Sequence, residues 1–370
     1  MKKTTISLLT FFILFFNYSF SQITFVDSIL SGGIYRNYRL YIPAAYTGST
    51  ARPLILNLHG YTSDALAQQL YSNFMPIADT ANFLMVYPNG TKINNQSYWN
   101  AGFGPGVDDI QFMSDLINHL SSQYSIDPNC VYSTGMSNGG YMSYTLACAL
   151  NNKIAAIASV TGSMVTPQYL SCLPNRAVPV MQIHGTADGT VPYNGLPTSI
   201  AIDTLVKYWV QNNNCNTSAI FNNVPNINLI DGCTAEHYVY NGGDNGSSVE
   251  LYKIIGGGHT WPGTYPIGVT CQDFNASEKI WLFFRKYKLN QFIGIEEINN
   301  NSLFSVFPNP SDKTITIEGD VLSVSIVDMT GKVVLASKQK QIDISQLAKG
   351  IYSIMLVSEK TRVTRKFVKI

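Results

Sequence analysis

A serine in a glycine-rich run is the first residue of this chain whose setting suggests chemistry. Ser137 is the centre of a Gly-x-Ser-x-Gly pattern at 135–139. The apolar run 130–133 predicts a buried strand before it, and 141–150 predicts a helix after it. A serine at such a strand-to-helix turn presents its hydroxyl at the end of a sheet, where it can attack an electrophile. We therefore predict a nucleophile, the alternative being an ordinary glycine-rich loop.

An acid and a base follow in chain order. Asp188 lies in the loop 185–188 after a predicted strand at 178–184, and His259 follows three glycines after a predicted strand at 250–255. The glycines allow the backbone of one loop to approach another closely. Asp188 alone is compatible with an ordinary turn, and His259 alone with a structural role. Together with Ser137 they have the composition of a nucleophile, an orienting acid and a general base. His184 is expected to form local hydrogen bonds only.

Ester or amide chemistry at Ser137 also needs donors for an oxyanion. The N–H of Asn138, directly after the serine, is one candidate, and the N–H of Tyr61 in the loop after strand 54–58 is the other. The alternative for this loop is a tight strand exit without function. The rings of Tyr61, Trp99 and Trp261 are expected to form aromatic walls around a substrate, unless they belong to the core.

Strands and helices must alternate to position these loops. Strands are predicted at 35–42, 54–58, 83–87, 130–133, 154–160, 178–184 and 250–255, and helices at 108–124, 141–150, 200–211 and 276–287. Short apolar strands separated by helices indicate an α/β fold with a mainly parallel sheet covered on both faces. The candidate loops then meet at the carboxyl ends of the strands, where such folds bind ligands.

Composition and the amino-terminal segment bear on the protein's location. The chain has 370 residues, 45% of them hydrophobic, and a formal net charge of +1 at pH 7, so no nucleic-acid partner is expected. Residues 1–21 combine Lys2 and Lys3 with an apolar run at 6–16 and small residues before Gln22, which predicts a cleaved signal peptide. No later stretch approaches the roughly 20 apolar residues of a membrane span. The protein is expected to be secreted.

Six cysteines behind a signal peptide are disulfide candidates. We favour Cys148 with Cys172 and Cys215 with Cys233. Cys130 and Cys271 stay unassigned, a buried free thiol being favoured for Cys130.

Two acidic residues, Asp108 and Asp109, suggest a metal site only weakly, because no further ligand lies at suitable spacing. Capping of the helix that follows explains them better, and no metal or other cofactor is expected.

Four segments in this order resemble the secreted polyhydroxybutyrate depolymerases and feruloyl esterases of the α/β-hydrolase fold. They are residues 58–62, 135–140, 184–193 and 257–263, and the likeness covers roughly residues 25–290. The resemblance implies Ser137 as nucleophile, Asp188 as orienting acid, His259 as base, and the Tyr61 and Asn138 amides as oxyanion donors. It also implies short-chain polyesters, feruloylated or acetylated polysaccharides, or small esters as substrates. No motif separates these three.

The last 70 or so residues are expected to form a separate domain. Strands are predicted at 314–318, 321–328, 332–336 and 351–357, with a hairpin turn at 328–331, so an all-β sandwich is expected. The motifs at 306–310, 331–332, 347–352 and 365–369 resemble the C-terminal sorting domain of the type IX secretion system. The resemblance implies the type IX secretion machinery as a partner and export through the periplasm. The alternative, a carbohydrate-binding β-sandwich, lacks a tryptophan to stack on sugar.

These observations predict a signal peptide at 1–21, a hydrolase domain at 22–295, a linker at 296–303 and a sorting domain at 304–370. The predicted function is a secreted serine carboxylic-ester hydrolase that acts through an acyl-enzyme on short-chain or aromatic esters of a polymer. Two alternatives remain. One is a peptidase that uses the same machinery, and the other is a catalytically idle surface binding protein.

Overall fold

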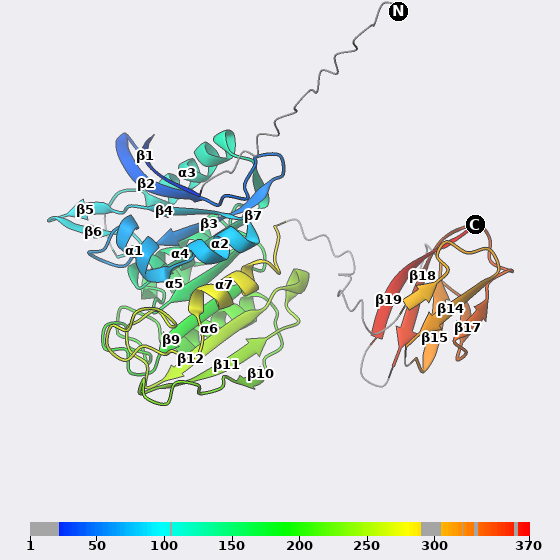
Figure 1. The fold of residues 1–370 in the computed structure, drawn as a ribbon. Helices are drawn as coiled ribbons and strands as arrows, with labels where there is room; N and C mark the ends of the chain where they lie inside the picture. Colours follow the sequence, from blue (N-terminus) through cyan, green and yellow to red (C-terminus); the bar gives the residue numbers. More distant parts are fainter. Residues whose placement is uncertain (1–21, 104–105, 290–304, 320, 329–331, 359–361) are drawn as a thin grey trace, which may run out of the picture. The chain divides into compact units, whose positions relative to one another are not determined.

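A computed structural model describes residues 22–103, 106–289, 305–319, 321–328, 332–358 and 362–370 (Figure 1). The chain divides into two compact units, Met1–Phe292 and Ile293–Ile370. The predicted signal peptide and linker lie outside the described residues. The domain boundaries drawn from the sequence therefore stay predictions. In the described part of the chain, no helix has the length and apolar character needed to cross a membrane.

The first unit is built on a ten-stranded sheet with the order β1-β2-β4-β3-β7-β8-β9-β12-β11-β10. The strands from β4 to β12 in this order run parallel, and the pairs outside them are antiparallel. The predicted α/β fold with a mainly parallel sheet is thus confirmed. The strands are β1 (Ile23–Ser31), β2 (Ile34–Ile42), β3 (Arg52–Leu58), β4 (Leu84–Pro88), β7 (Ile126–Met136), β8 (Ala156–Val160), β9 (Val180–Gly185), β10 (Ile220–Asn223), β11 (Thr234–Tyr240) and β12 (Val249–Ile255).

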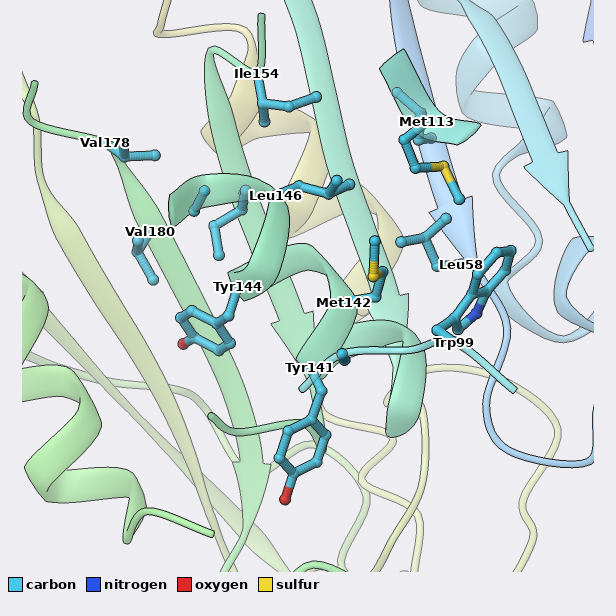
Figure 2. Packing of buried hydrophobic residues seen from close by; sticks show 14 of the residues in the cluster. Leu58, Trp99, Met113, Tyr141, Met142, Tyr144, Leu146, Ile154, Val178 and Val180 are labelled. Atoms are coloured by element: carbon cyan, nitrogen blue, oxygen red, sulfur yellow. The ribbon is translucent and has the colours of Figure 1, made fainter. Parts of the chain in front are cut away.

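Helices cover both faces of this sheet (Figure 1). The helices α3 (Asp109–Gln123), α4 (Asn138–Ala149) and α6 (Ile202–Asn212) contribute to one core, and α1 (Ala65–Ser72), α2 (Met75–Ala81) and α7 (Ala276–Phe284) to the other. Because successive strand residues point to opposite faces, Leu54 and Leu56 of β3 lie in the first core and Ile55 lies in the second. Figure 2 shows part of the first core, with Met142 of α4 beside Leu58 of β3.

Smaller elements complete the unit. A two-stranded sheet of β5 (Thr91–Ile93) and β6 (Gln96–Tyr98) follows the carboxyl end of β4. The short helix α5 (Thr166–Ser171) buries none of its residues. A 3-10 helix η1 (Asp244–Gly246) connects the antiparallel strands β11 and β12. The sequence did not predict β1, β10 or β11. Strands β1 and β10 form the edges of the sheet and keep most of their residues exposed.

The acidic pair before α3 has two structural roles. Asp108 is the N-cap of α3, because its side chain accepts a hydrogen bond from the N–H of Gln111. Asp109 is buried and pairs with the guanidinium of Arg36 at 2.6 Å, and it also accepts from the N–H of Asn100. Capping therefore explains Asp108 as predicted, whereas the ion pair of Asp109 was not foreseen.

The structure corrects one of the two favoured disulfides. Cys148 and Cys172 are bonded, as predicted, but Cys215 and Cys233 are both free. Cys233 precedes the first residue of β11, whereas the neighbour of Cys215, Asn216, donates to Asn241 just beyond the last residue of β11. A seven-residue strand separates its two ends by roughly 23 Å. The two cysteines therefore lie at opposite ends of β11 and cannot pair.

The second unit consists of two antiparallel sheets around one core, in agreement with the predicted all-β fold. One has the order β13-β14-β17 and the other β16-β15-β18-β19. The predicted turn residues 329–331 lie outside the described residues, but the flanking strands β15 and β16 do pair antiparallel. The strands are β13 (Ser305–Phe307), β14 (Thr314–Glu318), β15 (Ser323–Val327), β16 (Val333–Ser337), β17 (Gln341–Asp343), β18 (Gly350–Val357) and β19 (Arg362–Lys369).

Candidate active site

Ser137 occupies a strained turn between β7 and α4. Its backbone has φ 54° and ψ −118°, a combination that costs energy for a residue with a side chain. Hydrogen bonds hold the turn on both sides: the Ser137 N–H donates to Val160 O at 2.8 Å, and Ser137 O accepts from the Tyr141 N–H. The serine therefore lies at the carboxyl end of the parallel sheet, in the geometry that the sequence pattern implies.

The flanking glycines are required for close packing rather than for backbone rotation. A Cβ atom on Gly139 would lie 2.1 Å from Leu58 O, and one on Gly135 would lie 2.6 Å from the Gly139 backbone. Neither glycine has a positive φ, whereas Ser137 has. The two glycines allow α4 to begin directly against β3.

Asp188 and His259 come together from two neighbouring loops. Asp188 follows β9, His259 follows β12, and these strands are parallel neighbours in the sheet. His259 Nδ1 lies 2.8 Å from Asp188 Oδ2. A carboxylate can only accept, so Nδ1 carries the hydrogen and Nε2 retains a free lone pair. The imidazole is thereby oriented as a base.

A glycine permits the approach of these two loops. A Cβ atom on Gly185 would lie 2.1 Å from Gly257 O, so no larger residue fits between the loops. The N–H of Ala187 donates to Gly257 O at 3.0 Å, and the N–H of Gly256 donates to the Thr186 hydroxyl at 2.9 Å. The glycine run before His259 thus lies in direct contact with the aspartate loop.

Asp188 is held as a carboxylate despite its burial. Burial by itself raises the pKa of this carboxyl, but the hydrogen bond and charge of His259, together with the Val191 N–H, outweigh it and leave the pKa below its ordinary value. The other oxygen, Oδ1, accepts from the N–H groups of Thr190 and Val191, each at 2.8 Å. Both oxygens are therefore engaged, and the carboxylate has one orientation.

A buried network behind the aspartate was only partly foreseen. Tyr144 donates to Gln182 Oε1, so the Gln182 amide nitrogen faces Gly162 O and His184 Nδ1. His184 Nε2 then donates to Val191 O at 2.8 Å. Burial lowers the pKa of His184 to about 4, so the ring is neutral. The expectation of local hydrogen bonding is correct, but the connection from His184 through Val191 to Asp188 has no signal in the sequence.

The two candidate oxyanion donors lie beside the serine. Asn138 is the first residue of α4, so its N–H has no acceptor within the helix. A Cβ atom on Gly60 would lie 3.6 Å from Ser137 Cβ, which places the loop before Tyr61 against the nucleophile. Within the described ranges, the Tyr61 N–H has no acceptor, whereas that of Thr62 donates to Ser97 O. The side chain of Asn138 is occupied separately, because it bonds to both backbone groups of Trp99.

Ser137 and His259 line one cavity of about 370 Å³. Its walls include Tyr61, whose side chain is largely exposed, together with Tyr71 and Ile267. Tyr71 belongs to α1, a helix that the sequence did not predict, so it was missed. The cavity is open to solvent and mainly apolar around the serine, as an acyl group requires.

The structure corrects the expected role of both tryptophans. Trp99 and Trp261 are 0% exposed and belong to the two cores of the sheet. The indole N–H of Trp99 donates to His59 O, and that of Trp261 donates to the Ser277 hydroxyl. Neither indole lines the cavity, because each is packed beneath the loop that carries a candidate residue. Figure 2 shows Trp99 in this buried position beside Leu58.

Comparison with known proteins agrees with this fold. The structure resembles an acetyl xylan esterase from Aspergillus awamori with a TM-score of 0.53 at 14% identity, over 70% of this chain and 98% of that one. The first unit therefore has the α/β-hydrolase fold. Residues 107–217 match the family described as phospholipase/carboxylesterase, and residues 305–370 match the secretion system C-terminal sorting domain.

Two relatives of known name are similar to this chain over part of its length. Feruloyl esterase B of Piromyces equi is 28% identical over 229 residues, which cover 59% of this chain and 41% of that protein. Poly(3-hydroxyalkanoate) depolymerase C of Paucimonas lemoignei is 25% identical over 229 residues, 57% of this chain and 55% of that protein. The likeness thus spans only part of each relative. The two resemblances read from the sequence are confirmed: the first unit has the α/β-hydrolase fold and is similar to carboxylesterases over part of its length. The match of residues 305–370 to a sorting domain indicates export to the surface or medium.

Proposed function

We propose that this protein is a secreted serine carboxylic-ester hydrolase that releases short-chain or aromatic acyl groups from a polymer. The observation that carries the proposal is the pairing of His259 Nδ1 with the buried Asp188 carboxylate at 2.8 Å, beside a cavity that Ser137 also lines. Such an arrangement activates a serine, and no cofactor is needed for it.

The steps follow from this geometry. Ser137 attacks the ester carbonyl while His259 Nε2 accepts its proton, and the Asp188 carboxylate stabilises the resulting imidazolium. The free N–H groups of Tyr61 and Asn138 donate to the oxyanion of the tetrahedral intermediate. His259 then returns the proton to the leaving alcohol, and a water molecule releases the acid from the acyl-enzyme by the same steps in reverse.

A second cavity supports a polymer as the substrate. It has a volume of about 600 Å³ and shares Ser63 with the cavity at the serine, so the two adjoin. Asn37 and Asn89 line it together with Tyr35, a residue that is 74% exposed. Hydrogen-bonding groups with one exposed ring suit a hydroxyl-rich chain better than a purely apolar one. We infer that a saccharide on the alcohol side of the ester occupies this groove.

The test is a comparison of rates on p-nitrophenyl esters of increasing chain length, methyl ferulate, acetylated xylan and polyhydroxybutyrate film. Acetyl to butyryl and feruloyl esters should exceed palmitoyl esters by at least about tenfold in kcat/KM, a difference of roughly 1.4 kcal/mol. Equal or faster turnover of palmitoyl esters would indicate a lipase instead.

The nucleophile is tested by Ser137→Ala. The variant should lose at least about a thousandfold in kcat while keeping its fold, because the three residues act as a unit. A folded variant that retained more than a tenth of the activity would remove Ser137 from this role. Hydrolysis of peptide rather than ester substrates by the parent protein would favour the peptidase alternative, and no hydrolysis at all would favour the binding protein.

The sorting domain supports a second part of the proposal. We infer that the type IX secretion machinery of the cell envelope recognises residues 304–370 after the chain has crossed into the periplasm. The family match over 305–370 supports this partner.

A further inference from the structure

Two of the free cysteines lie next to each other. The sulfur atoms of Cys233 and Cys271 and one carboxylate oxygen of Asp231 all fall within 4.8 Å of one another. Both cysteines are buried, one before β11 and the other in the segment between β12 and α7. The other two free cysteines have different neighbours: Cys130 Sγ donates to Asp127 and Cys215 Sγ donates to Ser247 O. Cys233 and Cys271 are thus the free thiols with a second sulfur close by.

Asp231 holds the two cysteine segments together through the backbone. Its Oδ1 accepts from the N–H of Cys233 at 3.1 Å, and its Oδ2 accepts from the N–H of Gln272 at 2.8 Å. Both carboxylate oxygens therefore serve main-chain donors. This arrangement aligns the two cysteine segments around their sulfur atoms. It leaves the Asp231 carboxylate poorly available as a metal ligand, because binding a metal would require it to give up these backbone hydrogen bonds.

The environment that an exported protein meets favours disulfide formation. The sorting domain indicates export, and Cys148 and Cys172 already form a disulfide in the same unit. Disulfides form and persist in the oxidising environment that exported proteins meet.

We propose that Cys233 and Cys271 form a second disulfide in the exported protein. The S–H bond of each cysteine breaks and one S–S bond forms. The two electrons and two protons pass to the disulfide of a thiol–disulfide oxidoreductase, which becomes a dithiol. A disulfide needs Cβ atoms about 3.5–4.5 Å apart, so the two segments close by side-chain rotation and a small adjustment of the loop.

The bridge would fix the segment that carries His259. Cys233 directly precedes Thr234, which pairs with Ile255 at the end of β12. Cys271 O accepts from the Gly263 N–H at 2.8 Å, and Val269 O accepts from the Gly258 N–H at 2.9 Å. These bonds hold the two halves of the segment 256–275 together, and the disulfide would join this segment to the start of β11 in the sheet. The bridge therefore restrains the segment that carries the base of the active site.

Peptide mapping without reductant tests the bridge directly. The full-length protein is recovered after export, denatured in iodoacetamide, digested and analysed by mass spectrometry. We expect alkylation of Cys130 and Cys215, a cross-linked peptide pair for Cys148 and Cys172, and a second cross-linked pair for Cys233 and Cys271. Alkylation of Cys233 and Cys271 alongside an intact Cys148–Cys172 bridge would overturn the proposal. Release of zinc on denaturation with both thiols alkylated would overturn it in favour of a metal site.

A variant provides a second measurement. Replacement of both cysteines by serine should lower the melting temperature by roughly 5–10 °C, because the bridge closes a long loop in the unfolded chain. Cys215→Ser is the matched control, since it removes a buried thiol that has no bridge, and it should shift the melting temperature much less. Reduction should lower the melting temperature of the parent protein by more than that of the double variant, which keeps only the Cys148–Cys172 bridge. Equal melting temperatures for the double variant and the parent would count against the bridge, and neither measurement depends on ester hydrolysis.

Discussion

Replacement of Asp188 by asparagine tests the orientation of the base. Asp188 Oδ1 accepts from two N–H groups, those of Thr190 and the buried Val191, so this position demands an oxygen. The amide oxygen of asparagine must therefore lie there, and its NH₂ group takes the place of Oδ2 opposite His259 Nδ1. An NH₂ group donates, so Nδ1 becomes an acceptor and the imidazole proton moves to Nε2. The nitrogen that should accept the serine proton is then already protonated.

The magnitude follows from two steps. Turning the amide over would place NH₂ against both donors and cost about 1–3 kcal/mol for the buried Val191 bond alone, so the unproductive orientation is preferred. Loss of the correct tautomer in a Ser-His-Asp triad lowers kcat by about 10⁴, or roughly 5.5 kcal/mol of transition-state stabilisation. We expect Asp188→Asn to show this loss with little change in KM.

The assay is the steady-state hydrolysis of p-nitrophenyl acetate by purified protein, with circular dichroism to verify the fold. Asp108→Asn is the matched control, because Asp108 is an exposed N-cap and asparagine caps equally well. It should leave both kcat and the melting temperature unchanged. A folded Asp188→Asn protein with kcat within tenfold of the parent would refute the assigned role of Asp188.

Three further predictions test the supporting structure. The folded-state pKa of His184, about 4, lies below its unfolded value of about 6.5, so the unfolded chain binds the proton first as the pH falls. The free energy of unfolding should therefore fall by up to about 3 kcal/mol between pH 6.5 and pH 4. Urea unfolding should show that His184→Gln flattens this pH dependence, and an unchanged slope would contradict the role of His184. Gly139→Ala should lower the free energy of unfolding by about 1–3 kcal/mol, because its Cβ would lie 2.1 Å from Leu58 O. Gly189→Ala has open space around it and should leave the melting temperature unchanged, and equal effects of the two variants would argue against the tight turn at Gly139. A chain that ends near Asn299 should keep its rate on soluble esters yet stay inside a native host, as immunoblots of medium and cells would record, and normal export would refute the sorting role.

The sequence by itself determined the class of fold and the order of the candidate residues. The pattern around Ser137 needs only a strand before it and a helix after it, and both are encoded in a dozen neighbouring residues. Hydrophobic periodicity likewise located β3, β9, β12, α3 and α6 to within a few residues. Exposed edge strands such as β1 have no comparable pattern, because only part of one face is buried, and they were not predicted.

Only the tertiary structure decided which distant residues meet. The indoles of Trp99 and Trp261 are close to the candidate residues in sequence, yet packing turns both into the cores, and Tyr71 from an unpredicted helix lines the cavity instead. The partner of Cys233 depended on the length and direction of β11, which separates it from Cys215 and brings it to Cys271. Local sequence sets dihedral preferences and periodicity, whereas side-chain neighbours across loops depend on how the sheet and helices pack, and no short motif records that.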